Sequence, residues 1–216
     1  MNIELLLKEG TRLSKPCLYL TPNSDNSHEI HAIWGGSGLI EIPAGRDWKH
    51  RVTVSDVLLQ SLGFPIEGSL CVYEVEAEDD WIAVIRPSVS LFRSVSFGVP
   101  LYARPMISFP PLEALCLYGN SEIEAWLQAQ GLSRADADAL YGTELGEAYR
   151  RKYEEQSPLY TGKADVVLGG WHIIWPEEDA YDENDGSLLL WTFREAEPWL
   201  EVWLSGQQLS VKARIT

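Results

Sequence analysis

The chain of 216 residues has few cysteines and no long hydrophobic run. Its three cysteines, Cys17, Cys71 and Cys116, are far apart, lie in apolar contexts and form no CxxC pair. This spacing argues against a disulfide framework or a cysteine zinc site and predicts reduced core thiols in a cytoplasmic protein. No apolar stretch approaches the roughly 18 residues that span a bilayer. Acidic residues interrupt the short apolar run MNIELLLKE, which is therefore unlike a signal peptide.

Basic residues are also scarce. The chain has 17 Lys and Arg against 32 Asp and Glu, a formal net charge of −15. The excess is spread along the sequence, at −4 for residues 1–110, −5 for 111–162 and −6 for 163–216. Such a field repels nucleic acid and anionic membranes and favours a basic protein partner, so we expect neither nucleic-acid nor membrane binding. Solubility alone is the alternative explanation of the acidity.

Recognisable catalytic and metal-binding motifs are missing as well. The run Gly35–Gly38 matches neither a dinucleotide-binding nor a phosphate-binding loop, and Ser37 is not in a nucleophile elbow. His28 and His31 are three apart at a predicted loop-to-strand junction, where their side chains diverge. The acidic run 179–186 has glycine where an EF-hand loop needs an oxygen ligand. We therefore expect no cofactor and no metal, and the sequence favours a binding role over an enzymatic one without deciding between them.

Alternating apolar and polar residues predict β-strands in both end regions of the chain. The predicted strands are 17–20, 29–34, 69–77, 80–86, 90–97, 105–109, 165–168, 172–175, 187–194, 199–204 and 208–215. The last two read as a hairpin that turns near Ser205-Gly206-Gln207.

Helical periodicity appears at 55–62 and throughout 111–156. Ser55 is the expected N-cap of the first helix and Gly63 its end. In the central segment we expect helices at 111–118, 121–130, 133–142 and 143–156, with a capping box at Ser121–Glu124. The predicted fold is therefore α+β: a mostly antiparallel sheet, or two small ones, from both ends of the chain, with the helical segment 111–156 packed on it. We expect one domain, 1–216; the alternative is a β-rich part, 1–110, followed by a helical and β part, 111–216.

Five of the nine tryptophans lie between Trp171 and Trp203, beside the densest acidic cluster of the chain. Strand alternation places Trp199, Glu201 and Trp203 on one face, near Lys212 or Arg214 of the next strand. Burial of that face under the helices is the alternative. The candidate partner-binding residues are Trp199, Glu201, Trp203, Glu177, Glu178, Asp179, Asp182, Glu183 and Asp185.

These features favour a non-catalytic, acidic, cytoplasmic protein-binding domain, such as an immunity-type inhibitor of a basic toxin or an adaptor. One alternative is a small-molecule-binding protein or enzyme with a tryptophan-lined pocket at His172, Trp171 and Trp175. Another is a structural domain that self-associates through the C-terminal hairpin.

Overall fold

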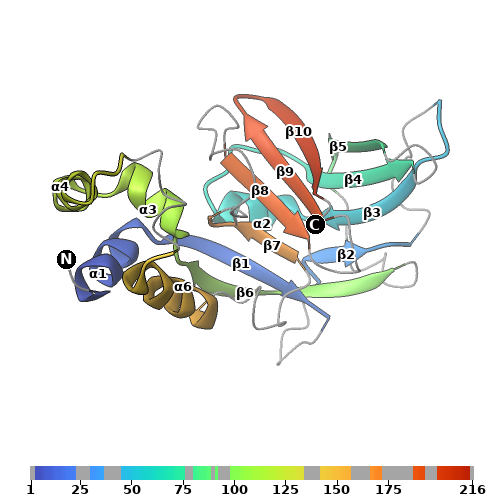
Figure 1. Cartoon of the computed structure of the whole chain (residues 1–216). Helices are drawn as coiled ribbons and strands as arrows, with labels where there is room; N and C mark the ends of the chain where they lie inside the picture. The colour runs from blue at the N-terminus through green and yellow to red at the C-terminus, as the bar shows by residue number, and fades with distance from the viewer. Residues whose placement is uncertain are drawn as a thin grey trace. The chain divides into compact units, whose positions relative to one another are not determined.

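The computed structural model of the chain describes residues 3–22, 30–36, 45–75, 80–88, 91, 98–133, 142–156, 166–171, 187–192 and 199–214. The fold is α+β with a large, curled antiparallel sheet, as the sequence predicts (Figure 1). Internal contacts divide the chain into two compact units. Unit 1 comprises Met1–Pro16, Ile107–Lys163 and Gly170–Asn184, and unit 2 comprises Cys17–Met106, Ala164–Gly169 and Asp185–Thr216.

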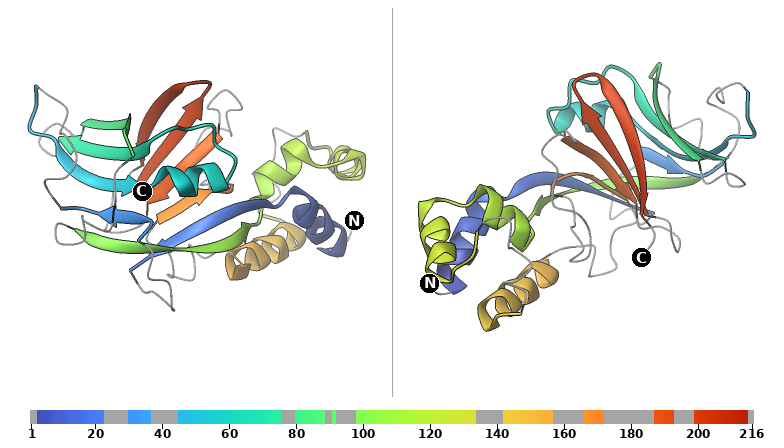
Figure 2. Two further views of the ribbon diagram at one scale, coloured as in Figure 1. Left: turned by 180° about the vertical axis from the view of Figure 1, so that it is seen from behind. Right: turned by 45° about the horizontal axis from the view of Figure 1, so that its top comes forward.

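One sheet of ten strands dominates the described structure, in the order β10-β9-β8-β7-β1-β6-β2-β3-β4-β5. The strands are β1 (Lys15–Thr21), β2 (Ala32–Trp34), β3 (Lys49–Val54), β4 (Ser69–Val75), β5 (Asp80–Arg86), β6 (Val99–Ser108), β7 (Val166–Gly169), β8 (Ser187–Thr192), β9 (Trp199–Ser205) and β10 (Gln208–Arg214). The sheet curls so far that β10 contacts β5, although the two strands lie at opposite ends of the pairing order (Figure 2). Both ends of the sequence thus supply one sheet.

The core of unit 2 fills the inside of this curl. Alternate apolar residues of the strands point inward, including Leu18, Val52, Leu70, Leu168 and Val202. Helix α2 (Asp56–Ser61) adds Leu58 and Leu59 to the same cluster. Burying one such side chain contributes about 1.5–3 kcal/mol to folding, so this cluster is a main source of the unit's stability.

Several strand predictions are confirmed and others are corrected. The ranges 69–77, 80–86, 199–204 and 208–215 correspond closely to β4, β5, β9 and β10. Strand β3 was not predicted, and β6 is longer than the predicted 105–109. Pro100 and Pro105 lie within β6 and weaken its strand signal. The predicted elements at 90–97, 133–142 and 172–175 lie almost entirely outside the described residues.

Four helices form the described part of unit 1: α1 (Ile3–Leu13), α3 (Leu112–Tyr118), α4 (Ser121–Ala129) and α6 (Glu144–Gln156). Helices α1, α3 and α6 contact one another. The sequence did not predict α1, although Ile3, Leu6, Gly10 and Leu13 recur at helical spacing. Gly10 permits close packing, because its backbone lies directly against the rings of Phe109 and Tyr149.

The helix boundaries confirm most of the predicted termini, including Ser55 as the N-cap of α2, and correct one N-cap. Gly63 (φ 85°) and Gly131 (φ 72°) end α2 and α4 as expected. Asn120, not Ser121, caps α4, and its side chain accepts hydrogen bonds from the backbone N–H groups of Glu122 and Ile123. Ser55 occupies the N-cap position of α2, but its side chain makes no capping hydrogen bond.

Candidate functional site

The β9–β10 hairpin carries three of the predicted partner-binding residues. Its register pairs Glu201 with Lys212 and Trp199 with Arg214, as strand alternation predicts. Trp203 Nε1 donates a hydrogen bond of 3.0 Å to Glu201 Oε2, and Lys212 Nζ lies 5.5 Å from the centroid of the Trp203 ring. Ammonium, indole and carboxylate therefore form one contiguous cluster on β9 and β10.

The sequence left open whether the strand face that carries Glu201 and Trp203 is exposed or covered. Glu201 is 1% exposed and Trp203 is 2% exposed. In the folded monomer these two side chains are interior groups and do not present an open aromatic surface. The Trp199 side chain lies outside the described residues, as do Glu177, Glu178, Asp179, Asp182, Glu183 and Asp185.

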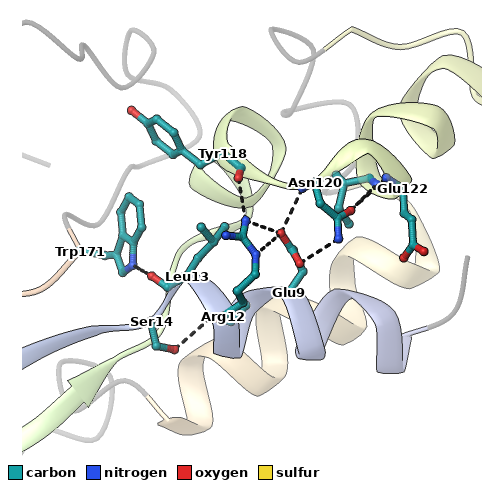
Figure 3. Close-up of polar contacts among 10 residues, drawn as sticks. Glu9, Arg12, Leu13, Ser14, Tyr118, Asn120, Glu122 and Trp171 are labelled. Atoms are coloured by element: carbon teal, nitrogen blue, oxygen red, sulfur yellow. Dashed lines mark hydrogen bonds and ion pairs between the residues drawn. The ribbon is translucent and has the colours of Figure 1, made fainter.

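Trp171 is the described member of the predicted ligand pocket; His172 and Trp175 lie outside the described residues. Its backbone N–H donates to Ser108 Oγ at 2.9 Å, and its indole Nε1 donates to the Leu13 carbonyl at 2.8 Å. The side chain is 6% exposed. Figure 3 shows the indole N–H pointing to the end of α1. Both of its N–H groups are thus satisfied within unit 1.

A lysine and a tyrosine lie against the same indole. Lys15 Nζ is 3.5 Å from the centroid of a Trp171 ring, close enough for a cation–π contact. The Tyr118 and Trp171 ring centroids are 5.8 Å apart, with the planes inclined by 37°. Burial lowers the pKa of the Lys15 ammonium. Trp171 is therefore packed by neighbours of its own unit, an arrangement expected of a structural anchor.

A second polar cluster in unit 1 centres on Glu9, which is 3% exposed (Figure 3). Its carboxylate accepts hydrogen bonds from Arg12 Nε at 2.7 Å, from the Asn120 backbone N–H at 3.0 Å and from Asn120 Nδ2 at 3.1 Å. Arg12 also donates to the carbonyl of Tyr118 at 3.1 Å. The hydrogen bond from Arg12 is the main cause that holds the pKa of Glu9 below its usual value, against the opposing effect of burial.

The Glu9 cluster holds α1 against the start of α4. One Asn120 side chain donates to Glu9 and accepts from the first turn of α4, so it links both elements. A carboxylate with this many donors is satisfied and ionised, which suits a structural role better than proton transfer. Sequence reasoning missed the Glu9 cluster because Asn120, which links Glu9 to α4, lies 111 residues away along the chain.

A chain of polar groups also lies on the outer face of β3 and β4, in unit 2. His50 Nδ1 lies 2.8 Å from the Gly35 carbonyl, His50 Nε2 lies 2.7 Å from Thr53 Oγ1, and Thr53 Oγ1 lies 3.6 Å from Cys71 Sγ. Since a carbonyl only accepts, Nδ1 carries the proton. In the neutral ring, Nε2 then accepts the hydroxyl proton of Thr53.

This chain brings a histidine and a cysteine into one network, but the protonation states do not favour nucleophilic catalysis. Burial lowers the pKa of His50 and raises the pKa of the Cys71 thiol. A reactive cysteine needs the opposite shift, toward the thiolate. Burial likewise raises the pKa of Cys17, to about 12. All three cysteines are free and buried, as the sequence predicts.

The sequence has two local groups of basic residues, within 46–51 and 150–152, and they are largely paired with acids. Arg46 forms an ion pair with Asp80, and Arg51 forms one with the buried Glu74. Arg150 pairs with Glu147 at 2.9 Å, and Lys152 pairs with Glu155 at 2.6 Å. The positive charges of these side chains therefore neutralise neighbouring carboxylates.

Within the described residues, no group of three or more His, Cys, Asp and Glu side chains is arranged to hold a metal ion. None of the helices in those parts of the chain is long and apolar enough to cross a membrane. No protein-family model matches the sequence, and no curated protein matches it.

Proposed function

We propose that this protein is a non-catalytic, cytoplasmic binding domain that captures a basic partner protein, acting as an immunity-type inhibitor or as an adaptor. The observation that carries the proposal is the acidic segment, residues 172–186. It contains six Asp and Glu and no Lys or Arg. Acidic side chains concentrated in one segment favour encounter with a basic surface by electrostatic steering.

The ends of the acidic segment support this proposal. Trp171, immediately before it, is held in unit 1 by hydrogen bonds to Leu13 and Ser108. Ser187, immediately after it, begins β8 and pairs with Leu204 of β9 in unit 2. Each end is therefore anchored in its own unit, and binding residues are frequently carried on connecting segments of this kind.

Two alternative functions are a ligand pocket at Trp171 and self-association through the C-terminal hairpin. The packing of these two regions favours neither. Trp171 is already covered by Lys15 and Tyr118 within its own unit, so its indole offers no open face to a ligand. In unit 2 the outer strand of the C-terminal hairpin, β10, contacts β5 of the same chain. That contact does not favour pairing of β10 with a second copy.

The proposal is tested by capturing partners from a lysate of the source organism and then measuring association kinetics with the purified partner. The test variant carries Glu178→Lys and Glu183→Lys. The matched control carries Asp47→Lys and Glu67→Lys, two exposed acids outside the acidic segment, so both variants change the net charge equally.

We expect the test variant to slow association by about tenfold at low ionic strength and to flatten its salt dependence, because steering is a local field effect. The control variant should keep most of the wild-type rate. Equal rates and equal salt dependence for all three proteins would show that the acidic segment is not the contact.

A further inference from the structure

A β-bulge brings a histidine and a threonine together on the outer face of β3. Residues three apart in a regular strand point to opposite faces of the sheet, so His50 and Thr53 would diverge. The register between β3 and β4 shifts between His50 and Val52, so that His50 pairs with Tyr73 and Thr53 pairs with Cys71. Because residues 71 and 73 share a face of β4, the bulge places His50 and Thr53 on that same face.

Hydrogen bonds lead from the histidine into the interior of unit 2. His50 is half-buried, whereas Thr53 is 1% exposed and Cys71 is 0% exposed. His50 Nε2 lies 2.7 Å from Thr53 Oγ1, Thr53 Oγ1 lies 3.6 Å from Cys71 Sγ, and Cys71 Sγ lies 3.7 Å from the carbonyl oxygen of Ser69. A proton from solvent can therefore bind at the imidazole, and a line of hydrogen bonds connects that imidazole to the two buried groups.

The neutral and the protonated ring require opposite directions along this line. In the neutral ring Nδ1–H donates to the Gly35 carbonyl, so the Thr53 hydroxyl donates to Nε2. In the protonated ring both nitrogens are donors, so Nε2–H donates to Thr53 Oγ1 and the Thr53 proton turns to the Cys71 sulfur. The thiol then donates to the Ser69 carbonyl. Each donor of the line thus keeps an acceptor in both states.

The ionisable groups near the ring come from β3, β4 and β5. Tyr73 packs edge-on against the His50 ring, with the centroids 5.7 Å apart, and Arg86 of β5 makes a hydrogen bond with Tyr73. The sequence neighbours of His50 on β3 are the cations Lys49 and Arg51. The acids of β4 and β5 are each paired with an arginine: Glu74 with Arg51, and Asp80 with Arg46. These groups are neutral, cationic or already paired, so hydrogen-bond acceptors have to accommodate a proton on His50.

We propose that His50, Thr53 and Cys71 form a pH-sensitive relay, in which protonation of His50 turns the Thr53 hydroxyl from the ring to the Cys71 sulfur. The relay carries a change of charge at the half-buried ring to a buried thiol near the start of β4. The hydrogen bond from Nδ1–H to Gly35 is present in both states, so the ring stays in place while the hydroxyl turns. The relay lies within unit 2 and does not depend on the proposed partner-binding function.

The test is the pKa of His50, measured by NMR of the ring in the full chain and in variants at Cys71, which is two hydrogen bonds away from the ring. Cys71→Ala removes the acceptor that the Thr53 proton needs in the protonated state and leaves the bonds of the neutral ring intact. We therefore expect the pKa of His50 to fall by about 0.5, the equivalent of one weak hydrogen bond.

Two further variants separate the relay from a general effect of substitution in the core. Cys71→Ser keeps an acceptor at this position, so it should restore most of the wild-type pKa of His50. Cys17→Ala changes a buried thiol on β1 and should leave the pKa of His50 unchanged.

The thiol itself gives a second readout. The S–H stretching band of Cys71, identified by its loss in Cys71→Ser, should shift over the pH range in which His50 titrates, because the sulfur then accepts a hydrogen bond. Thr53→Val, which keeps the shape of the side chain without its hydroxyl, should abolish that shift.

An unchanged pKa of His50 in Cys71→Ala would overturn the proposal, as would an equal fall in Cys71→Ala and Cys71→Ser. A Cys71 band that stays constant while His50 titrates would overturn it as well.

Discussion

Glu9 is a buried acid whose carboxylate accepts hydrogen bonds from two different parts of unit 1. Arg12 is on the same helix, whereas Asn120 is the N-cap of α4. The carboxylate therefore contributes to stability only while it is ionised. Since its folded-state pKa is lowered, that contribution is fully present above the ordinary glutamate pKa and is lost as the pH falls through the folded-state value.

We predict that Glu9→Gln lowers the free energy of unfolding by about 1–3 kcal/mol at neutral pH, because the amide cannot satisfy the same donors. The difference in the free energy of unfolding between this variant and the wild type should shrink as the pH falls below about 4.3. Urea unfolding between neutral and acidic pH measures both effects. Glu4→Gln, an exposed change on the same helix, is the control, and a deficit that does not vary with pH would contradict this account.

His50 is a half-buried imidazole whose two nitrogens face different kinds of group. The Gly35 carbonyl requires a proton on Nδ1, and Thr53 can donate to Nε2. Burial favours the neutral ring and lowers its pKa. The stabilising contribution of neutral His50 is thus complete above the ordinary histidine pKa and declines as the pH falls below it.

Nitrogen-detected NMR at neutral pH should show His50 as the Nδ1–H tautomer, with a pKa below the usual value of about 6.5. His31, the other described histidine, gives an internal reference in the same spectra. An Nε2–H tautomer, or a pKa at or above that value, would show that the Gly35 carbonyl does not fix the ring.

At the scale of elements, the packing of α1 outweighs the low helix propensity of one of its residues. Gly10 is unfavourable in a helix interior by about 1 kcal/mol relative to alanine. Its position is nevertheless buried, because Phe109 and Tyr149 occupy the space that a side chain would need. Tyr149 is itself fixed by a hydrogen bond of 2.9 Å from its hydroxyl to the Pro110 carbonyl.

We therefore predict that Gly10→Ala destabilises the protein by about 1–3 kcal/mol, the usual range for overpacking, although alanine is the better helix former. A Cβ would lie 2.8 Å from the Tyr149 hydroxyl and closer still to Phe109. Thr11→Ala, at the adjacent exposed position, should change stability by less than about 0.7 kcal/mol. Chemical denaturation of both variants distinguishes packing from propensity, and stabilisation by Gly10→Ala would refute close packing at this position.

At the scale of the whole molecule, the charge is distributed unevenly. The described residues contain 15 of the 32 acids and 13 of the 17 Lys and Arg. Most of the excess negative charge therefore belongs to the remaining segments, including residues 172–186. Repulsion among these charges opposes the compact state at low ionic strength.

Added salt should accordingly raise the thermal midpoint of the protein between about 0.01 M and about 0.15 M sodium chloride, as the screening length falls from roughly 30 Å to 8 Å. The Glu178→Lys, Glu183→Lys variant should show a smaller rise. Calorimetry at fixed pH measures this. An unchanged or falling midpoint in the wild type would mean that local ion pairs, such as Arg51–Glu74, outweigh long-range repulsion.

Local patterns were sufficient to predict several elements. Strand β5 was located to the residue by its turn-forming neighbours, and the β9–β10 register followed from alternation and a short turn. Strand β6 was underestimated because proline disfavours strands, yet Pro100 and Pro105 are tolerated there. At the start of α4, Ser121 and Glu124 resembled a capping box, but the adjacent Asn120 supplies the cap.

The candidate sites were less accessible to prediction from the sequence. The pairing of Glu201 with Lys212 followed from strand period, but the burial of Glu201 and Trp203 depends on what covers the sheet face. The Glu9–Asn120 contact has no sequence signal, because it depends on the packing of two helices.

The sequence by itself determined the α+β class, the acidic charge and the burial of the three cysteines, because composition and periodicity set these properties locally. Only the tertiary structure decided which polar groups meet: Glu9 with Asn120, Lys15 with Trp171, and His50 with Thr53. Such contacts depend on curling of the sheet and packing of the helices, and these bring together residues whose separation along the chain carries no local signal.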